Sequence, residues 1–219
     1  MRILDLQGSV SIALALALLA PLSLSAQQEE STSKTDSSIS EPDSEGKSDT
    51  PTLEDLAALS VPSDPHELLA TTVGTWDVTI RVWSDPDPEA EPASETTGTA
   101  VGRWILGERF VETVYEGEVL GRPFEGLKIE GYDKGAETYI STWRDNLGTY
   151  TLVFKGTCEA SCRERTMSSS FLEPVSKQTF RLRGVTTITD EDAYTYESFV
   201  MTPNGQEFKN MELDAKRRN

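Results

Sequence analysis

The sequence has very few of the residues that bind transition metals best: one histidine, His66, and two cysteines, Cys158 and Cys162, in 219 residues. A structural zinc site takes four protein ligands, usually cysteine and histidine. A Ser-His-Asp catalytic triad would have to use His66 as its general base. The sequence contains no Gly-x-Ser-x-Gly motif, which carries the nucleophilic serine in many hydrolases. We therefore predict no metal site and no catalytic residues, and we assign His66 a structural role.

Positive charge is also scarce, with 20 Lys and Arg against 37 Asp and Glu and a formal net charge of −17. Phosphate backbones and anionic lipid surfaces are bound through clustered basic side chains. The charge balance therefore predicts that the protein binds neither nucleic acid nor an anionic membrane surface.

Long hydrophobic runs are missing except in residues 10–20, close to the N-terminus. A basic residue precedes this run, Pro21 ends it, and the small residues Ser23 and Ser25 suit a cleavage site, so residues 1–26 read as a secretory signal peptide. The alternative is a transmembrane anchor, but the run is shorter than the ~20 apolar residues that a span needs. We predict an exported protein, periplasmic or secreted, with no membrane segment after cleavage.

Residues 27–64 lack both aromatic side chains and hydrophobic periodicity. The segment is acidic and rich in Ser, Thr and Pro, and such a composition cannot bury enough apolar surface to offset the entropy lost on ordering. We predict a disordered acidic linker over 27–64, in which residues 53–59 could at most form two helical turns. One folded domain is expected over residues 65–219.

Apolar and polar side chains alternate through residues 65–219. Trp76, Val78 and Ile80 alternate with polar residues, for example, and this period of two is typical of a half-buried strand. Tight turns such as Pro203-Asn204-Gly205 separate the segments. The expected strands are residues 75–83, 95–105, 109–118, 122–132, 137–145, 149–156, 164–172, 178–189, 192–202 and 206–214.

This succession predicts an all-β domain, a single antiparallel meander of about ten strands preceded by a short helix in residues 65–72. A meander of this length closes into a barrel or folds into two sheets, because open edges invite pairing with other chains. An edge strand left exposed would be a route to a homodimer.

The two cysteines lie between two expected strands, with three residues between them. In an exported protein such a pair is expected to form a disulfide, whereas redox-active pairs normally enclose two residues. We predict a structural disulfide between Cys158 and Cys162 that closes a small loop and contributes about 2 kcal/mol at most.

Several short motifs follow one another through the same domain. They are His66-x-x-Leu69, Val73-Gly-Thr-Trp-Asp77, Arg103-Trp-Ile-Leu-Gly107, Pro123-Phe-Glu-Gly126, Tyr139-x-Ser-x-Trp143 and Met201-Thr-Pro-Asn-Gly205. In this order and spacing, residues 65–213 resemble the bacterial family known as domain of unknown function 1579. The family name implies no established activity, so the resemblance assigns no catalytic residue.

Gly74-Thr75-Trp76 also resembles the Gly-x-Trp signature of lipocalins, which are grouped as calycins with fatty-acid-binding and nitrobindin-like proteins. The resemblance implies a calycin-like barrel in which Trp76 closes one end. Independently of it, we expect His66 to fix the short helix against the barrel rim. The resemblance to nitrobindin-like proteins suggests haem as a cofactor, and the axial ligand of haem iron is usually histidine. His66 precedes the first expected strand and no histidine follows it, so we expect no cofactor.

Aromatic side chains lie on most of the expected strands, and a small barrel lined by aromatics and a few polar groups is how apolar ligand pockets are built. Two acids join this set because Glu112 shares a strand face with Phe110, and Glu197 shares one with Phe199. If those faces point inward, the acids are buried; the alternative is that both face water. The candidate cavity residues are Trp104, Glu112, Tyr115, Tyr139, Trp143, Glu197 and Phe199.

The predicted barrel interior is compatible with three different functions. The sequence favours a binding module for a small, largely apolar molecule, and so a protein that is not an enzyme. The alternatives are a metal-independent enzyme that uses cavity carboxylates, and a structural or interaction module whose barrel is filled by its own side chains. Connected space below ~300 Å³ would count against the first two.

Overall fold

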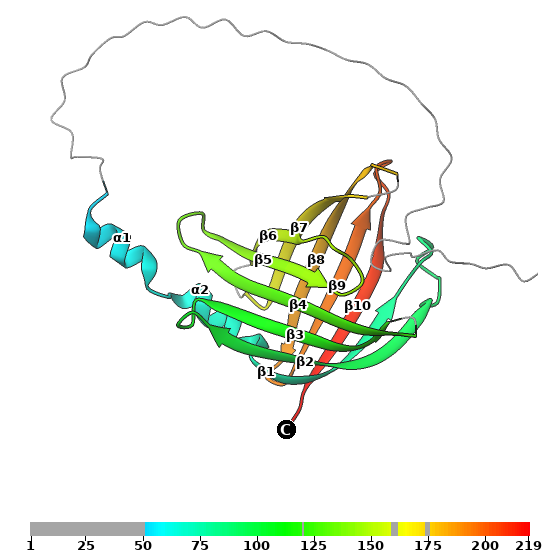
Figure 1. The fold of residues 1–219 in the computed structure, drawn as a ribbon, viewed down its shortest axis with the longest axis horizontal. Helices are drawn as coiled ribbons and strands as arrows, with labels where there is room; N and C mark the ends of the chain where they lie inside the picture. Colours follow the sequence, from blue (N-terminus) through cyan, green and yellow to red (C-terminus); the bar gives the residue numbers. More distant parts are fainter. Residues whose placement is uncertain (1–50, 120, 159–161, 174–175) are drawn as a thin grey trace, which may run out of the picture. The chain divides into compact units, whose positions relative to one another are not determined.

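The computed structural model describes residues 51–119, 121–158, 162–173 and 176–219 (Figure 1). The predicted signal peptide, residues 1–26, and most of the predicted linker lie outside the described residues. Within the described ranges, no helix has the length and apolar character needed to cross a membrane.

Helix α1 (Leu53–Ser60) falls inside the predicted linker and spans about the two turns that the sequence allowed there. Its start is fixed by a capping box, in which the Thr52 hydroxyl accepts from the Asp55 amide and the Asp55 carboxylate accepts from the Thr52 amide. None of its residues is buried. The helix is therefore held by local hydrogen bonds rather than by packing.

The rest of the described chain forms a closed antiparallel barrel, because the first and last of its ten strands pair with each other. The predicted all-β meander, closing into a calycin-like barrel, is confirmed. The strands are β1 (Gly74–Val82), β2 (Ser94–Ile105), β3 (Phe110–Val119), β4 (Arg122–Asp133), β5 (Thr138–Asp145), β6 (Leu152–Cys158), β7 (Glu164–Leu172), β8 (Thr179–Asp190), β9 (Ala193–Met201) and β10 (Glu207–Arg217).

Each strand in this barrel pairs with its neighbours in sequence, and β1 pairs with β10 over residues 76–82 and 211–217. The seam between β6 and β7 is the short one, since these strands pair only over residues 155–158 and 165–168. Among the described residues, the first part of β6 and the last part of β7 have no partners across this seam, and pairing there stays the predicted route to a homodimer.

A short helical segment, α2 (Asp64–Glu67) followed by the 3-10 helix η2 (Leu68–Thr72), lies across one end of the barrel (Figure 1). We call this the closed end. The rings of His66 and Tyr132 pack edge-to-face there, with their centroids 5.8 Å apart. His66 also accepts a hydrogen bond from the Ser63 amide at Nδ1 (3.1 Å), which fixes the start of α2.

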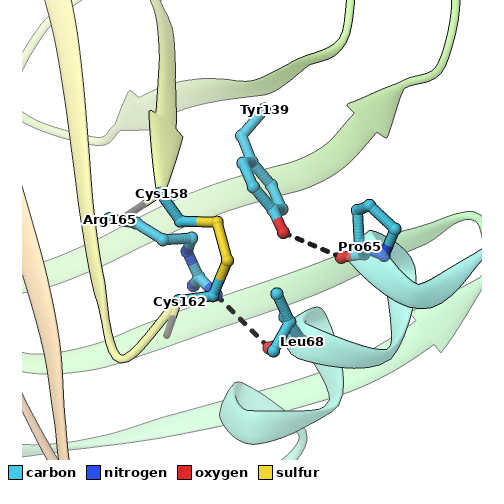
Figure 2. The surroundings of a disulfide bond; sticks show 6 residues. All are labelled: Pro65, Leu68, Tyr139, Cys158, Cys162 and Arg165. Carbon is cyan, nitrogen blue, oxygen red and sulfur yellow. Dashed lines mark hydrogen bonds between the residues drawn. A yellow bond between two sulfur atoms is a disulfide. The ribbon is translucent and has the colours of Figure 1, made fainter. Parts of the chain in front are cut away.

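Barrel side chains hold this segment by donating to its backbone carbonyls. The Tyr139 hydroxyl donates to the Pro65 carbonyl (3.0 Å), and Arg165 Nη1 donates to the Leu68 carbonyl (3.3 Å; Figure 2). The indole of Trp76 donates to the Thr72 carbonyl (3.2 Å). These bonds tie three backbone carbonyls of the helical segment to side chains of the barrel.

Cys158 and Cys162 form the predicted disulfide, in the hairpin between β6 and β7. Figure 2 shows the bond beside Arg165 at the closed end, near the residues that hold α2 and η2. The disulfide therefore fixes the hairpin from which Arg165 reaches the helical segment.

Candidate functional site

The half of the barrel away from α2 and η2 is hollow. A cavity of about 190 Å³ lies there, lined by inward side chains of β1 and of β3 to β10 and by the loop between β5 and β6. We call this region the cavity. Its volume lies below the ~300 Å³ at which drug-sized pockets begin, although an apolar cavity of about 150 Å³ is enough to bind benzene.

One wall of the cavity is apolar and comes from strands β6 to β8. Leu152, Phe154, Met167 and Leu182 belong to it, and each is at most 9 % exposed. Burial alternates along β6 and along the first part of β7 and of β8, so that every second side chain there points inward. These four side chains offer an apolar ligand contacts without a polar group to desolvate.

A second, aromatic wall adjoins the first and is built around Trp143, which pairs with Leu152 in the β5–β6 register. Tyr115 meets its ring edge-on at 5.5 Å, and Phe124 stacks on it at 6.2 Å. Gly126 makes this cluster possible, because a Cβ there would come within 2.5 Å of the Trp143 ring. The indole is thus turned across the inner face of β4 and into the cavity.

Asp145 lies at the rim and fixes the orientation of two aromatic side chains. Its carboxylate accepts hydrogen bonds from Trp143 Nε1 (2.9 Å), the Tyr150 hydroxyl (3.2 Å) and the Leu147 amide (3.0 Å). Burial and the charge of Asp145 raise the pKa of Tyr150, so its hydroxyl stays protonated and able to donate. The rim is therefore rigid and its acid is fully satisfied.

A row of three charged side chains runs through the interior, from the closed end to the cavity. The carboxylate of Glu130 lies 3.4 Å from Arg165 Nη2 and accepts a hydrogen bond from Lys128 Nζ at 2.8 Å. Glu130 and Lys128 line the cavity, whereas Arg165 stands behind them against the ring of Tyr139. We call these three residues the charge row.

The charge row keeps Glu130 ionised. Burial alone would raise the pKa of this carboxyl, but the positive charges of Lys128 and Arg165 outweigh it and hold the pKa at about 2. A carboxylate in this state cannot serve as a general acid near neutral pH. Glu130 is therefore a fixed negative charge and not a proton donor.

Three tyrosines also line the cavity, beside the polar residues Ser141, Thr186, Ser198 and Asn210. Burial raises the pKa of Tyr115, Tyr194 and Tyr196, so all three remain protonated. The hydroxyl of Tyr196 lies over Gly184, where a Cβ would approach it within 2.6 Å. The Tyr115 and Tyr194 hydroxyls affect each other's pKa, but the Tyr194 hydroxyl has no partner in hydrogen-bond geometry.

Two of the candidate residues, Tyr115 and Trp143, line the cavity. Tyr139 shares the inward face of β5 with Trp143 but lies at the closed end, where its hydroxyl binds the Pro65 carbonyl. Trp104 packs against the core near Leu69, also away from the cavity. Trp76 is buried at the closed end, edge-on to Tyr194 at 4.9 Å.

The other three candidates, Glu112, Glu197 and Phe199, lie on the outer face of the barrel, which corrects their assignment to the cavity. Glu112 pairs with Arg103 and Glu197 with Lys209, while Arg183 lies over the Phe199 ring at 4.0 Å. The physical reason is parity, since Val111 and Thr113 on β3, and Ser198 and Val200 on β9, are the buried positions. Apolar side chains covered by neighbouring arginines made the outer face look like an inner one.

Lys128 and Glu130 were not among the residues that the sequence pattern predicted for the cavity. A signal was present, because both share the face of β4 that also carries Phe124 and Tyr132. Two charges on an apolar strand face indicate either an outer face or a buried ion pair, and only the register of β4 with its neighbours decides between them.

Fold and cavity together define a class: a closed, ten-stranded antiparallel barrel with one end covered by a short helix and the other half hollow. Within this class, the chain belongs to the family described as "Protein of unknown function (DUF1579)", which matches residues 61–217. A search of curated proteins returned no match.

Solved structures with the same architecture include Rv2717c from M. tuberculosis, at 15 % identity and a TM-score of 0.54, covering 72 % of this chain and 99 % of that one. An S-type phycobiliprotein lyase, CPES, from Guillardia theta is similar at 12 % identity and a TM-score of 0.50, covering 77 % and 98 %. At these identities the likeness shows the fold alone.

Proposed function

We propose that the protein binds a small, largely apolar molecule in the cavity. The observation that carries the proposal is the contrast inside one barrel: the closed end is filled, whereas about 190 Å³ stays open between an apolar and an aromatic wall. A barrel that served only as a structural module would gain stability by filling this space, since unfilled volume forfeits packing energy. The size favours a molecule of one or two rings.

The enzyme alternative has less support. It required two inward acids free for proton transfer, and the acids that line the cavity are Glu130, held ionised by two cations, and Asp145, which accepts from three donors. The lowered pKa of Glu130 is the opposite of what a general acid needs, and Asp145 is already engaged as an acceptor.

A cavity-filling variant tests the proposal. Leu152→Trp places a larger ring in the apolar wall, and we expect it to abolish binding of benzyl alcohol and toluene while the protein stays folded. Val153→Trp is the matched control, because Val153 is the next residue on β6 and its side chain faces solvent. Calorimetric titration of the unmodified chain and of both variants measures the binding. The proposal would be contradicted if the unmodified chain bound neither probe. It would also be contradicted if Leu152→Trp bound the probes as tightly as Val153→Trp does.

We also propose that the protein is exported. The N-terminal pattern supports export, and so does the disulfide, since disulfides persist mainly in oxidising compartments. Mass spectrometry of the protein secreted by its host should find a mature N-terminus near residue 26. An intact N-terminus in the cytoplasmic fraction would contradict export.

A further inference from the structure

The charge row carries one more positive charge than negative. Arg165 and Lys128 flank the single carboxylate of Glu130, and the side chains of Arg165 and Glu130 are only 2 % and 4 % exposed. An uncompensated charge taken out of water is costly unless a counter-charge or hydrogen bonds compensate for it. The row therefore lacks an anion at one end.

The end that a ligand can reach is Lys128. Arg165 donates through Nη1 to the Leu68 carbonyl and lies against the Tyr139 ring, and its buried Nε and Nη2 make no hydrogen bond within the described residues. Arg165 does not line the cavity, whereas the Lys128 side chain does, so an anion in the cavity meets Lys128. Asp145, the other acid of the lining, is held at the rim by its three donors and makes no ion pair among the described residues. Thus no second carboxylate of the described chain pairs with Lys128.

Unused hydrogen-bonding groups surround Lys128. An ammonium group has three donors, and within the described chain only Glu130 accepts from Nζ. Thr113, directly opposite Lys128 in the β3–β4 register, is fully buried and its hydroxyl has no partner. Tyr194 lines the cavity, and its buried hydroxyl lies beside that of Tyr115 without a hydrogen bond of normal geometry. Lys128 is close enough to lower the pKa of Tyr194. Buried polar groups are normally satisfied, so these groups point to a bound acceptor.

We infer that the ligand is a small carboxylic acid, bound as the carboxylate against Lys128 with its apolar body between the two walls. This inference rests on the proposed function and adds the chemical class. The carboxylate completes an alternating row of Arg165, Glu130, Lys128 and ligand, and it accepts from Lys128 Nζ and the Tyr194 hydroxyl. The cavity volume limits the body to a ring or a short branched chain, and so excludes long acyl chains.

Matched probes separate the head group from the body. We expect benzoate and phenylacetate to bind the full chain at least tenfold more tightly than benzamide and phenylacetamide, which have the same shape without the charge. Calorimetric titration near neutral pH measures all four. Palmitate is expected not to compete.

Lys128→Met is the variant that isolates the charge. It leaves the Glu130–Arg165 pair in place, so we expect a folded protein that binds acids and amides equally. Lys155→Met, on the outer face of β6, should keep the preference for acids. Equal affinity of the unmodified chain for acids and amides would overturn the inference and leave the proposed function standing. If none of the four probes bound, both would be contradicted.

Discussion

The closed end and the cavity are two regions of one barrel, built from the same strands with the same alternation, yet only one of them is filled. At the closed end, side chains from the strands reach the helical segment and satisfy its carbonyls, as Tyr139, Trp76 and Arg165 do. In the cavity, Trp143 and Tyr150 turn to the wall and are fixed there by Asp145. The alternation of side chains along each strand decides which of them point into the barrel. The hydrogen-bond partners of these side chains then decide whether they fill the interior or leave a cavity.

The same substitution should therefore have different effects in the two regions. Leu69 of η2 is fully buried, whereas Leu147 lies at the rim of a space that already exists. We expect Leu69→Ala to lower the free energy of unfolding by about 4 kcal/mol, in the range for a filled core, and Leu147→Ala by about 1 kcal/mol. Urea denaturation measures both, and equal losses would contradict the contrast.

Glu130 lines the cavity and also pairs with Arg165 at the closed end, so its replacement should affect both regions. Glu130→Gln leaves two buried cations without their carboxylate, and we expect a loss of about 3 kcal/mol. Glu130→Asp, which keeps the charge, should lose less.

The acid dependence of stability gives a second measurement of the same group. The two cations hold the pKa of Glu130 at about 2, below its ordinary value of 4.5. Its stabilising contribution is thus complete above pH 4.5 and is lost progressively as the pH falls towards 2. The unfolding free energy of Glu130→Gln should lack this component of the acid dependence. An unchanged slope between pH 4.5 and 2 would contradict the ionised state.

The disulfide acts on the closed end alone. Because it closes a very short loop, Cys158→Ser with Cys162→Ser should cost about 2 kcal/mol. Binding of benzyl alcohol in the cavity should keep its affinity. A loss of affinity larger than threefold would show that the two regions are not separable in this way.

The smallest effect is expected from a single hydroxyl. Tyr139→Phe removes the donor to the Pro65 carbonyl and should cost about 1 kcal/mol. Hydrogen exchange of the α2 and η2 amides should become faster while exchange in β8 and β9 stays unchanged.

The sequence predicted the barrel well because a period of two is a direct consequence of strand geometry. It predicted the cavity less well, because parity shows only which residues share a face and not which face is inside. Glu112 and Phe199 were placed inward for that reason, and Lys128 and Glu130 were overlooked. The volume left open depends on side-chain orientations such as that of Trp143 over Gly126, which no local pattern specifies.

The methionine methyl groups offer the most direct test of the central claim, that the hollow half takes up a small apolar molecule. Met167 and Met211 line the cavity, and Met201 does not. In a titration of the full chain with benzyl alcohol, followed by carbon–proton correlation spectra, the Met167 and Met211 signals should shift together and saturate while Met201 stays in place. Signals that do not move, or that move equally for all three methionines, would contradict the account.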